Sequence, residues 1–216
     1  DDLRREERQL KRAIVKNVGN EDAHVRLGKL YSDQNWFQLS EECFMNAIRL
    51  NAKNEDAYLY LGRLYRDQGQ MAPAEEAFKK VLELRSTSDD AYVGLADVYR
   101  EQGRYSEAEE NLQKALALNS KNVWVYDGLG KCYQARGRLD DAEVCFKKAI
   151  TLEPMNDWLW LTTGNLYFKM SETHDAEVCF LKARDLNPRN SEAYAALGYL
   201  YQAQGRSQEA ENFFKK

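Results

Sequence analysis

The sequence predicts an all-α protein, built as a right-handed solenoid of tandem antiparallel helix pairs. Three observations lead to this fold class. A tyrosine recurs every 34 residues without a gap. A small residue stands three positions before each tyrosine, and a large apolar residue stands 13 positions after it. A period held in register over most of the chain indicates repeating units that bury their apolar faces against their neighbours.

The three series share one spacing. The tyrosines are Tyr31, Tyr65, Tyr99, Tyr133, Tyr167 and Tyr201. The small residues are Gly28, Gly62, Ala96, Gly130, Gly164 and Gly198, and the large apolar residues are Phe44, Phe78, Leu112, Phe146, Phe180 and Phe214.

The most complete unit is residues 123–156, which carries Tyr126, Leu129, Gly130, Tyr133, Ala142, Phe146, Ala149 and Pro154. These residues match the pattern W-x2-L-G-x2-Y, A-x3-F and a closing proline, with tyrosine in place of the tryptophan. The unit resembles a tetratricopeptide repeat (TPR). The resemblance implies a TPR superhelix that serves as a protein-interaction scaffold.

Stepping by 34 residues divides the chain into one continuous array. Its parts are the second helix of an incomplete leading repeat (1–20), five full repeats (21–54, 55–88, 89–122, 123–156 and 157–190) and a truncated sixth (191–216). The incomplete ends predict a fragment of a longer chain. They also predict exposed apolar residues, namely Leu10, Ile14 and Val15 at one end and Phe213 and Phe214 at the other. We therefore predict self-association through these ends.

Cap and turn residues predict where the helices begin and end. Each first helix follows a strong N-cap residue, namely Asn20, Asn54, Ser88, Asn122, Asn156 or Asn190. Glycine ends four of these helices, while Asn35 and Ser171 replace it in the first and fifth repeats. We expect residues 170–174 to form an irregular turn.

A glutamate recurs in every second helix, at positions 41, 75, 109, 143, 177 and 211. One interpretation is a cation or basic-ligand site. The favoured one is N-terminal capping, because Ser106 and Glu109 have the spacing of a capping box and Pro73 stands where the first helical residue is expected.

Composition excludes several classes of function. The net charge is −4 and the isoelectric point is about 5.4, which disfavours a nucleic-acid binder. No apolar run approaches the roughly 18–20 residues of a membrane span, and the charged start is unlike a signal peptide. The four cysteines lack zinc-ligand spacing and are predicted to be packing residues in a reducing, cytoplasmic setting.

Catalytic patterns are also missing from the sequence. The two histidines, His24 and His174, lie in different repeats without a nucleophile or metal partner at a recognisable spacing, and His24 is predicted to be packed. No phosphate-binding loop, nucleophile elbow or zinc-peptidase pattern occurs. We expect neither an enzyme nor a cofactor.

By resemblance, the first helices of successive TPRs line a concave groove. The residues at its positions that are predicted to bind peptide are Tyr60, Arg63, Arg66, Arg100, Trp124, Asp127, Lys131, Trp158, Asn165, Phe168 and Tyr199. Trp124 and Trp158 share one repeat position, and either anchor a ligand or pack between repeats. The basic residues either hold acidic peptide side chains or pair with Asp67, Asp97, Glu101 and Asp127. The carboxylate clamp of chaperone-binding TPRs and the asparagine ladder of glycosyltransferase-linked arrays are both absent.

These observations predict a scaffold that binds an extended peptide or a helix of another protein in its groove. Two alternatives remain open. One is a regulatory or substrate-docking array attached to a larger enzyme, and the other is a self-assembling scaffold.

Overall fold

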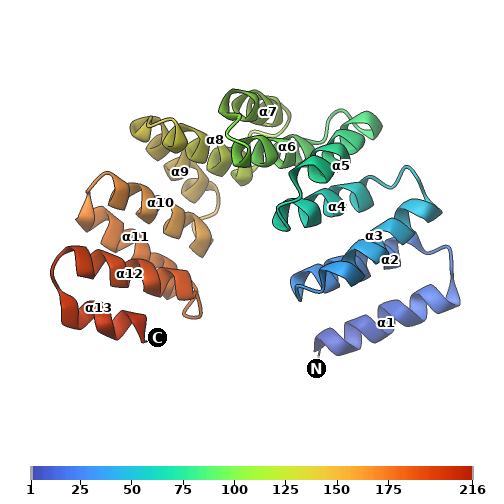
Figure 1. Ribbon diagram of the computed structural model, residues 1–216, viewed down its shortest axis with the longest axis horizontal. Helices are drawn as coiled ribbons and strands as arrows, with labels where there is room; N and C mark the ends of the chain where they lie inside the picture. Colours follow the sequence, from blue (N-terminus) through green and yellow to red (C-terminus); the bar gives the residue numbers. More distant parts are fainter. Residues whose placement is uncertain (1, 216) are drawn as a thin grey trace. The chain divides into compact units, whose positions relative to one another are not determined.

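The computed structural model describes residues 2–215, which form thirteen helices and no strand (Figure 1). They divide into two compact units, with the boundary between Ser120 and Lys121. The first unit holds α1 (Asp2–Lys16), α2 (Glu21–Asp33), α3 (Phe37–Leu50), α4 (Glu55–Asp67), α5 (Met71–Leu84), α6 (Asp89–Glu101) and α7 (Tyr105–Leu118). The second holds α8 (Val123–Ala135), α9 (Leu139–Leu152), α10 (Asp157–Lys169), α11 (Thr173–Leu186), α12 (Ser191–Ala203) and α13 (Ser207–Phe214).

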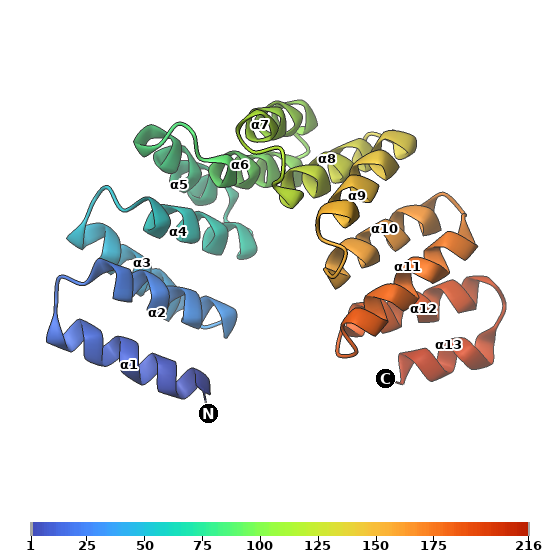
Figure 2. The ribbon, with the colours of Figure 1, turned by 180° about the vertical axis from the view of Figure 1, so that it is seen from behind.

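Each unit is a stack of helix pairs, which can be followed from both sides in Figures 1 and 2. The even-numbered helices α2 to α12 are the first helices of their pairs, and each packs closely on the helix that follows it. In the first unit α2, α4 and α6 also contact one another in succession, as α10 and α12 do in the second. The first helices of a unit therefore form one layer, and this arrangement confirms the predicted fold class.

The predicted N-caps of the first helices are confirmed. The side chain of Asn20 accepts a hydrogen bond from the Ala23 N–H, and that of Asn54 accepts one from the Ala57 N–H. The corresponding side chains before α6, α8, α10 and α12 act in the same way. An N–H without a partner inside the helix is thus satisfied at the start of each.

The turns after the first helices share one geometry, whether or not they contain glycine. Ser171 adopts a φ of 64° and Asn35 a φ of 59°, close to the 73° of Gly69. After Ser171, the Glu172 N–H bonds the Tyr167 carbonyl at 2.9 Å, as the Gln70 N–H bonds that of Tyr65 at 2.8 Å. The prediction of an irregular turn at 170–174 is therefore wrong.

Close packing of glycine against phenylalanine joins the two helices of a pair. A Cβ added to Gly164 would lie 2.5 Å from the ring of Phe180, and one added to Gly130 would lie 2.5 Å from Phe146. Both rings are almost fully buried. Glycine is therefore needed at this repeat position because the phenylalanine ring occupies the space that a side chain would fill.

The prediction of exposed ends is only partly right. Leu10 is buried, because it packs with Leu27, Leu30 and Cys43. Val15 and Phe214 are exposed, whereas Ile14 and Phe213 are partly buried.

The capping interpretation of the repeated glutamate is wrong. The second helices start two residues earlier than the capping box requires, so that Pro73 is the third residue of α5. The residue before each of them forms no side-chain cap hydrogen bond. The glutamates at 41, 75, 143 and 177 instead accept hydrogen bonds from tyrosines of the next first helix.

We call this set of contacts the tyrosine–glutamate ladder. Its hydrogen bonds join Tyr31 to Glu7 (3.1 Å), Tyr65 to Glu41 (2.7 Å), Tyr99 to Glu75 (3.1 Å), Tyr167 to Glu143 (2.9 Å) and Tyr201 to Glu177 (2.6 Å). Each bond ties the first helix of one repeat to the second helix before it. Burial raises the pKa of Tyr65, Tyr167 and Tyr201 to about 12.

Candidate interaction surface

In the first unit, the first-helix layer holds Tyr60 between two cations. The ammonium of Lys29 on α2 donates a hydrogen bond of 3.0 Å to the Tyr60 hydroxyl and lies 4.4 Å from the ring centroid. The guanidinium of Arg63, one turn along α4, lies 5.4 Å from the same centroid. Tyr60 also stacks on Phe44 of the preceding helix, with ring centroids 6.1 Å apart.

Carboxylates neutralise the other cations of this layer. Arg66 pairs with Asp97 on α6 at 2.8 Å and with Asp67 at 2.9 Å. Arg100 pairs with Glu101 at 2.8 Å and lies 3.5 Å from Asp97. This finding confirms the alternative that these arginines pair with neighbouring acids.

Arg63 pairs with a residue that the sequence did not suggest. Its guanidinium lies 3.1 Å from the carboxylate of Asp90, 27 positions further along the chain. A ligand for this part of the layer would have to compete with existing ion pairs. Because such exposed pairs contribute only about 0–1 kcal/mol each, the competition is feasible.

In the second unit, the first-helix layer is aromatic. Trp124 on α8 and Trp158 on α10 are 44% and 40% exposed. Phe168, near the end of α10, is 37% exposed, and Tyr199 on α12 is 59% exposed. We call these four residues the aromatic surface. Three first helices therefore present large apolar side chains to solvent from positions that the resemblance predicts to line a groove.

Lys131 ties α8 to this surface. Its ammonium bonds Asp127 at 2.5 Å and lies 5.3 Å from the ring of Trp158. Lys131 and Trp158 are 27 positions apart, the same separation as Arg63 and Asp90. The same pair of repeat positions thus forms an ion pair in the first unit (Arg63 and Asp90) and a cation–π contact in the second (Lys131 and Trp158). The difference arises because tryptophan replaces aspartate at the second position.

The remaining two predicted residues differ in accessibility. Asp127 is only 5% exposed, so its carboxylate accepts the hydrogen bond from Lys131 and is not accessible to a ligand. Asn165 is exposed on α10, three residues before Phe168. Of the predicted set, the structure thus brings Lys131 and Trp158 into contact and removes Asp127 from the surface.

Metal binding and thiol chemistry find no support within residues 2–215. No group of three or more histidine, cysteine or acidic side chains there could hold a metal ion. Burial raises the pKa of Cys43, Cys145 and Cys179 to about 11, so these thiols stay protonated at neutral pH. The same part of the chain has no helix that is long and apolar enough to cross a membrane.

Two family models match the sequence. The model of the cilia and flagella-associated protein 70 C-terminal domain, a TPR domain, matches residues 87–216, more than half of the chain. The chain belongs to this TPR family. The model of subunit 3 of the anaphase-promoting complex, cyclosome, matches residues 35–115. The predicted resemblance to tetratricopeptide repeats is thereby confirmed.

Solved TPR structures share the fold of this family member. The Cut9–Hcn1 hetero-tetramer of the anaphase-promoting complex matches with a TM-score of 0.83 and 16% identity, covering 100% of this chain and 45% of that chain. A TPR protein from Parabacteroides merdae matches with a TM-score of 0.79 and 24% identity, over 99% and 85%. YrrB, described as a TPR protein with an unusual peptide-binding site, matches with a TM-score of 0.55 and 22% identity, over 85% and 95%. No curated protein sequence matches significantly.

Proposed function

We propose that the chain is a protein-interaction scaffold that binds an extended peptide or a helix of a partner protein on its first-helix layer. The observation that carries the proposal is the aromatic surface, formed by Trp124, Trp158, Phe168 and Tyr199. Soluble proteins seldom expose several large apolar side chains in one layer without a binding role. The division into repeats from residue 21 onward, taken as one array, is part of the proposal.

The energetic argument favours the aromatic surface as the anchor. A few buried aromatic residues usually carry most of the free energy of binding at an interface. Arg63, Arg66 and Arg100 are suited to a different task. They would exchange their carboxylate partners in the chain for those of an acidic ligand, which makes the association rate of that ligand depend on salt.

The comparisons support this class of function. TPR families of the matched kind are typically non-catalytic scaffolds. Among the proteins of similar fold, YrrB has a peptide-binding site and Cut9 forms a complex with Hcn1. A reducing, cytoplasmic setting belongs to the same proposal, because all four cysteines are free thiols.

The test begins with capture of partners from the source cells by the intact chain, identified by mass spectrometry. The variant Trp124→Ala with Trp158→Ala should then weaken binding of a captured partner at least tenfold, about 1.4 kcal/mol. A matched control is Val144→Ala with Val178→Ala, which removes two exposed apolar side chains from the second helices α9 and α11. This control should bind as the wild type does.

A third variant separates anchoring from steering. Arg63→Glu with Arg66→Glu should lower the association rate and its salt dependence more than it raises the dissociation rate. Thermal melting shows whether each variant is folded. If the folded tryptophan variant retains full affinity, the aromatic surface is not the anchor.

A further inference from the structure

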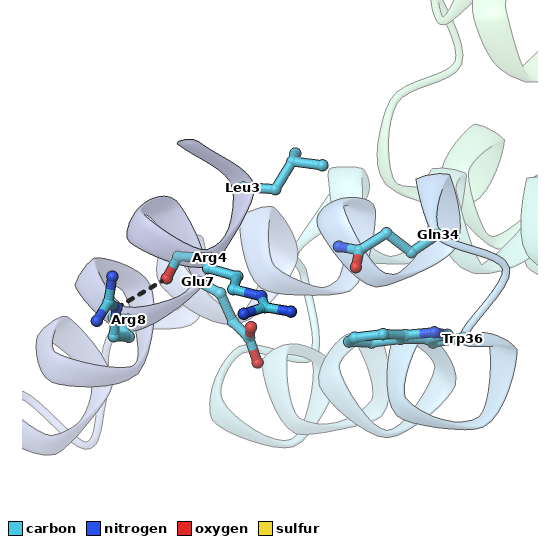
Figure 3. A pocket seen from close by; sticks show the side chains of 6 residues that line it. All are labelled: Leu3, Arg4, Glu7, Arg8, Gln34 and Trp36. Atoms are coloured by element: carbon cyan, nitrogen blue, oxygen red, sulfur yellow. Dashed lines mark hydrogen bonds between the residues drawn. The ribbon is translucent and has the colours of Figure 1, made fainter. Parts of the chain in front are cut away.

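A second candidate surface belongs to the first unit, whereas the aromatic surface belongs to the second. Trp36, in the turn between α2 and α3, is 47% exposed and lines two hollows. One hollow, of about 540 Å³, is lined by Leu3, Arg4, Glu7 and Arg8 of α1 together with Gln34 and Trp36. The other, of about 610 Å³, is lined by residues 35–39 and Gln68. Figure 3 shows the first hollow, with the Arg4 side chain extending from α1 toward the turn that carries Gln34 and Trp36.

The same turn position in other repeats explains why the surface is open here. Arg104 and Arg206 occupy this position, and each guanidinium lies 4.1 Å from the ring of its own repeat's ladder tyrosine, Tyr99 or Tyr201. Each also approaches the ladder glutamate, at 3.5 Å for Glu75 and 3.8 Å for Glu177. At Trp36 an indole packs on Tyr31 instead, with centroids 5.6 Å apart. An apolar ring thus stands where the third and sixth repeats place an arginine that pairs with the ladder.

The neighbouring helix α1 carries four exposed arginines, Arg4, Arg5, Arg8 and Arg12, none of which forms an ion pair with a carboxylate of residues 2–215. The pKa of Glu7 is lowered mainly by its hydrogen bond from Lys11, and the charge of Arg4 adds to this effect. Arg4, Arg8 and Arg12 are spaced by four residues and therefore share one side of the helix.

The acids of α1 are already engaged. Glu7 pairs with Lys11 at 2.8 Å and accepts the Tyr31 hydroxyl, and Glu6 lies 3.5 Å from Arg26. Five later arginines of the first unit, by contrast, each have an acidic partner: Arg63, Arg66, Arg85, Arg100 and Arg104. The charge left without a partner on this edge is therefore positive.

We propose that this edge binds an acidic peptide segment of a partner protein, with an apolar side chain inserted beside Trp36. Carboxylates of the peptide would pair with Arg4 and Arg8, which present forked donors suited to carboxylate oxygens. Leu3 and Leu39, 55% and 44% exposed, extend the apolar contact on either side of the indole. We call this the α1–Trp36 edge.

Peptide is favoured over nucleic acid because of the apolar side chains of the edge. Its cations are combined with three exposed apolar side chains, which fit a mixed acidic and apolar peptide better than a uniform polyanion. The proposal is independent of the aromatic surface, because the two surfaces share no residue.

The test uses fluorescence anisotropy with the full chain and a fluorescein-labelled peptide of alternating glutamate pairs and single leucine or phenylalanine residues. The variant Arg4→Glu with Arg8→Glu should weaken its binding at least tenfold. Trp36→Gln should weaken it at least fivefold while keeping the fold, since Gln70 occupies this position in the next repeat. Two matched controls, Arg189→Glu and Val144→Ala, change an exposed arginine and an exposed apolar residue outside both candidate surfaces and should leave binding unchanged.

Competitors decide between ligand classes. A peptide with each glutamate replaced by glutamine, or with each apolar residue replaced by serine, should compete at least tenfold less well than the unlabelled parent. The proposal is overturned if both edge variants melt as the wild type does and still bind normally. Equal competition by single-stranded RNA, or by the serine-substituted peptide, overturns it as well, because the site would then be a general polyanion surface.

Discussion

Tyr167 on α10 donates a hydrogen bond of 2.9 Å to Glu143 on α9, a residue 24 positions earlier in the chain. The same separation recurs in the other four described pairs of the ladder. Each bond crosses from one repeat to the next, so the ladder couples neighbouring repeats in addition to their apolar packing. In a solenoid this nearest-neighbour coupling largely decides cooperativity.

Two substitutions of Tyr167 should therefore lower the free energy of unfolding by different amounts. Tyr167→Phe keeps the ring and loses the hydrogen bond to a charged acceptor, for which we expect a loss of about 1–2 kcal/mol. Tyr167→Ala also removes a ring that is only 8% exposed, which should cost about 3–5 kcal/mol. Urea unfolding followed by circular dichroism measures both. Tyr199→Phe is the control, because that ring is exposed and its change should stay within about 0.5 kcal/mol.

The ladder also predicts how stability depends on pH. The hydrogen bond from Lys147 lowers the pKa of Glu143, and that from Tyr167 adds to it. Burial alone would raise the pKa of Glu75, but the hydrogen bonds from Lys79 and Tyr99 outweigh it and the net shift is downward. A carboxyl with a lowered pKa in the folded state stabilises the fold above its unfolded pKa of about 4.5, and this stabilisation is lost as the pH falls.

The melting temperature should accordingly decline as the pH is lowered from about 5 to about 3. In Glu75→Gln with Glu143→Gln the decline should be shallower, since neither side chain can then titrate. Glu76→Gln, an exposed neighbour outside the ladder, should leave the slope as it is in the wild type. An unchanged slope in the double variant would show that the ladder glutamates do not contribute to acid sensitivity.

Much of the fold could be predicted because its signals are local or strictly periodic. Asn54 accepts the Ala57 N–H whatever lies elsewhere in the chain, so a cap residue predicts its own helix start. The positions of Gly164 and Phe180 recur with the period of the repeat, and glycine and phenylalanine occupy them in every repeat except the third. The packing of such pairs follows from their volumes.

The partner of the repeated glutamate could not be predicted from a local pattern. Ser106 and Glu109 have capping-box spacing, but α7 already begins at Tyr105. Each second helix begins two residues after the residue with positive φ, which is two residues earlier than a capping box would require. The repeated glutamate therefore lies beyond the first turn of the helix. A non-local signal was available, since glutamate and tyrosine each recur in every repeat at a constant separation.

The candidate surfaces show the same division between local and non-local signals. The shared position of Trp124 and Trp158 on the first helices followed from the period, and the structure gives both partial exposure. Burial of Asp127 did not follow from it, because that depends on how neighbouring helices pack around the residue. Trp36 was missed, because it lies in a turn rather than at a groove position of the repeat.

The contact between Gly164 and Phe180 allows a test of packing inside a repeat. A Cβ on Gly164 would lie 2.5 Å from the phenylalanine ring, so Gly164→Ala should destabilise the fold by about 1–3 kcal/mol through overpacking. Urea unfolding of the single variant measures this cost. Gly205→Ala is an informative comparison, because a Cβ there meets nothing within 4 Å and the strain arises only from a φ of 75°.

The chain itself suggests the compensating change. The third repeat carries Ala96 and Leu112 where other repeats carry glycine and phenylalanine, and both residues are buried. Phe180→Leu alone should leave a cavity and cost about 1–2 kcal/mol. Combined with Gly164→Ala, it should cost less than the sum of the two single changes by at least about 1 kcal/mol, since the added methyl fills the space that the ring vacates. Strict additivity would mean that the two positions do not share one volume, and that alanine at position 96 is tolerated for a reason unrelated to Leu112.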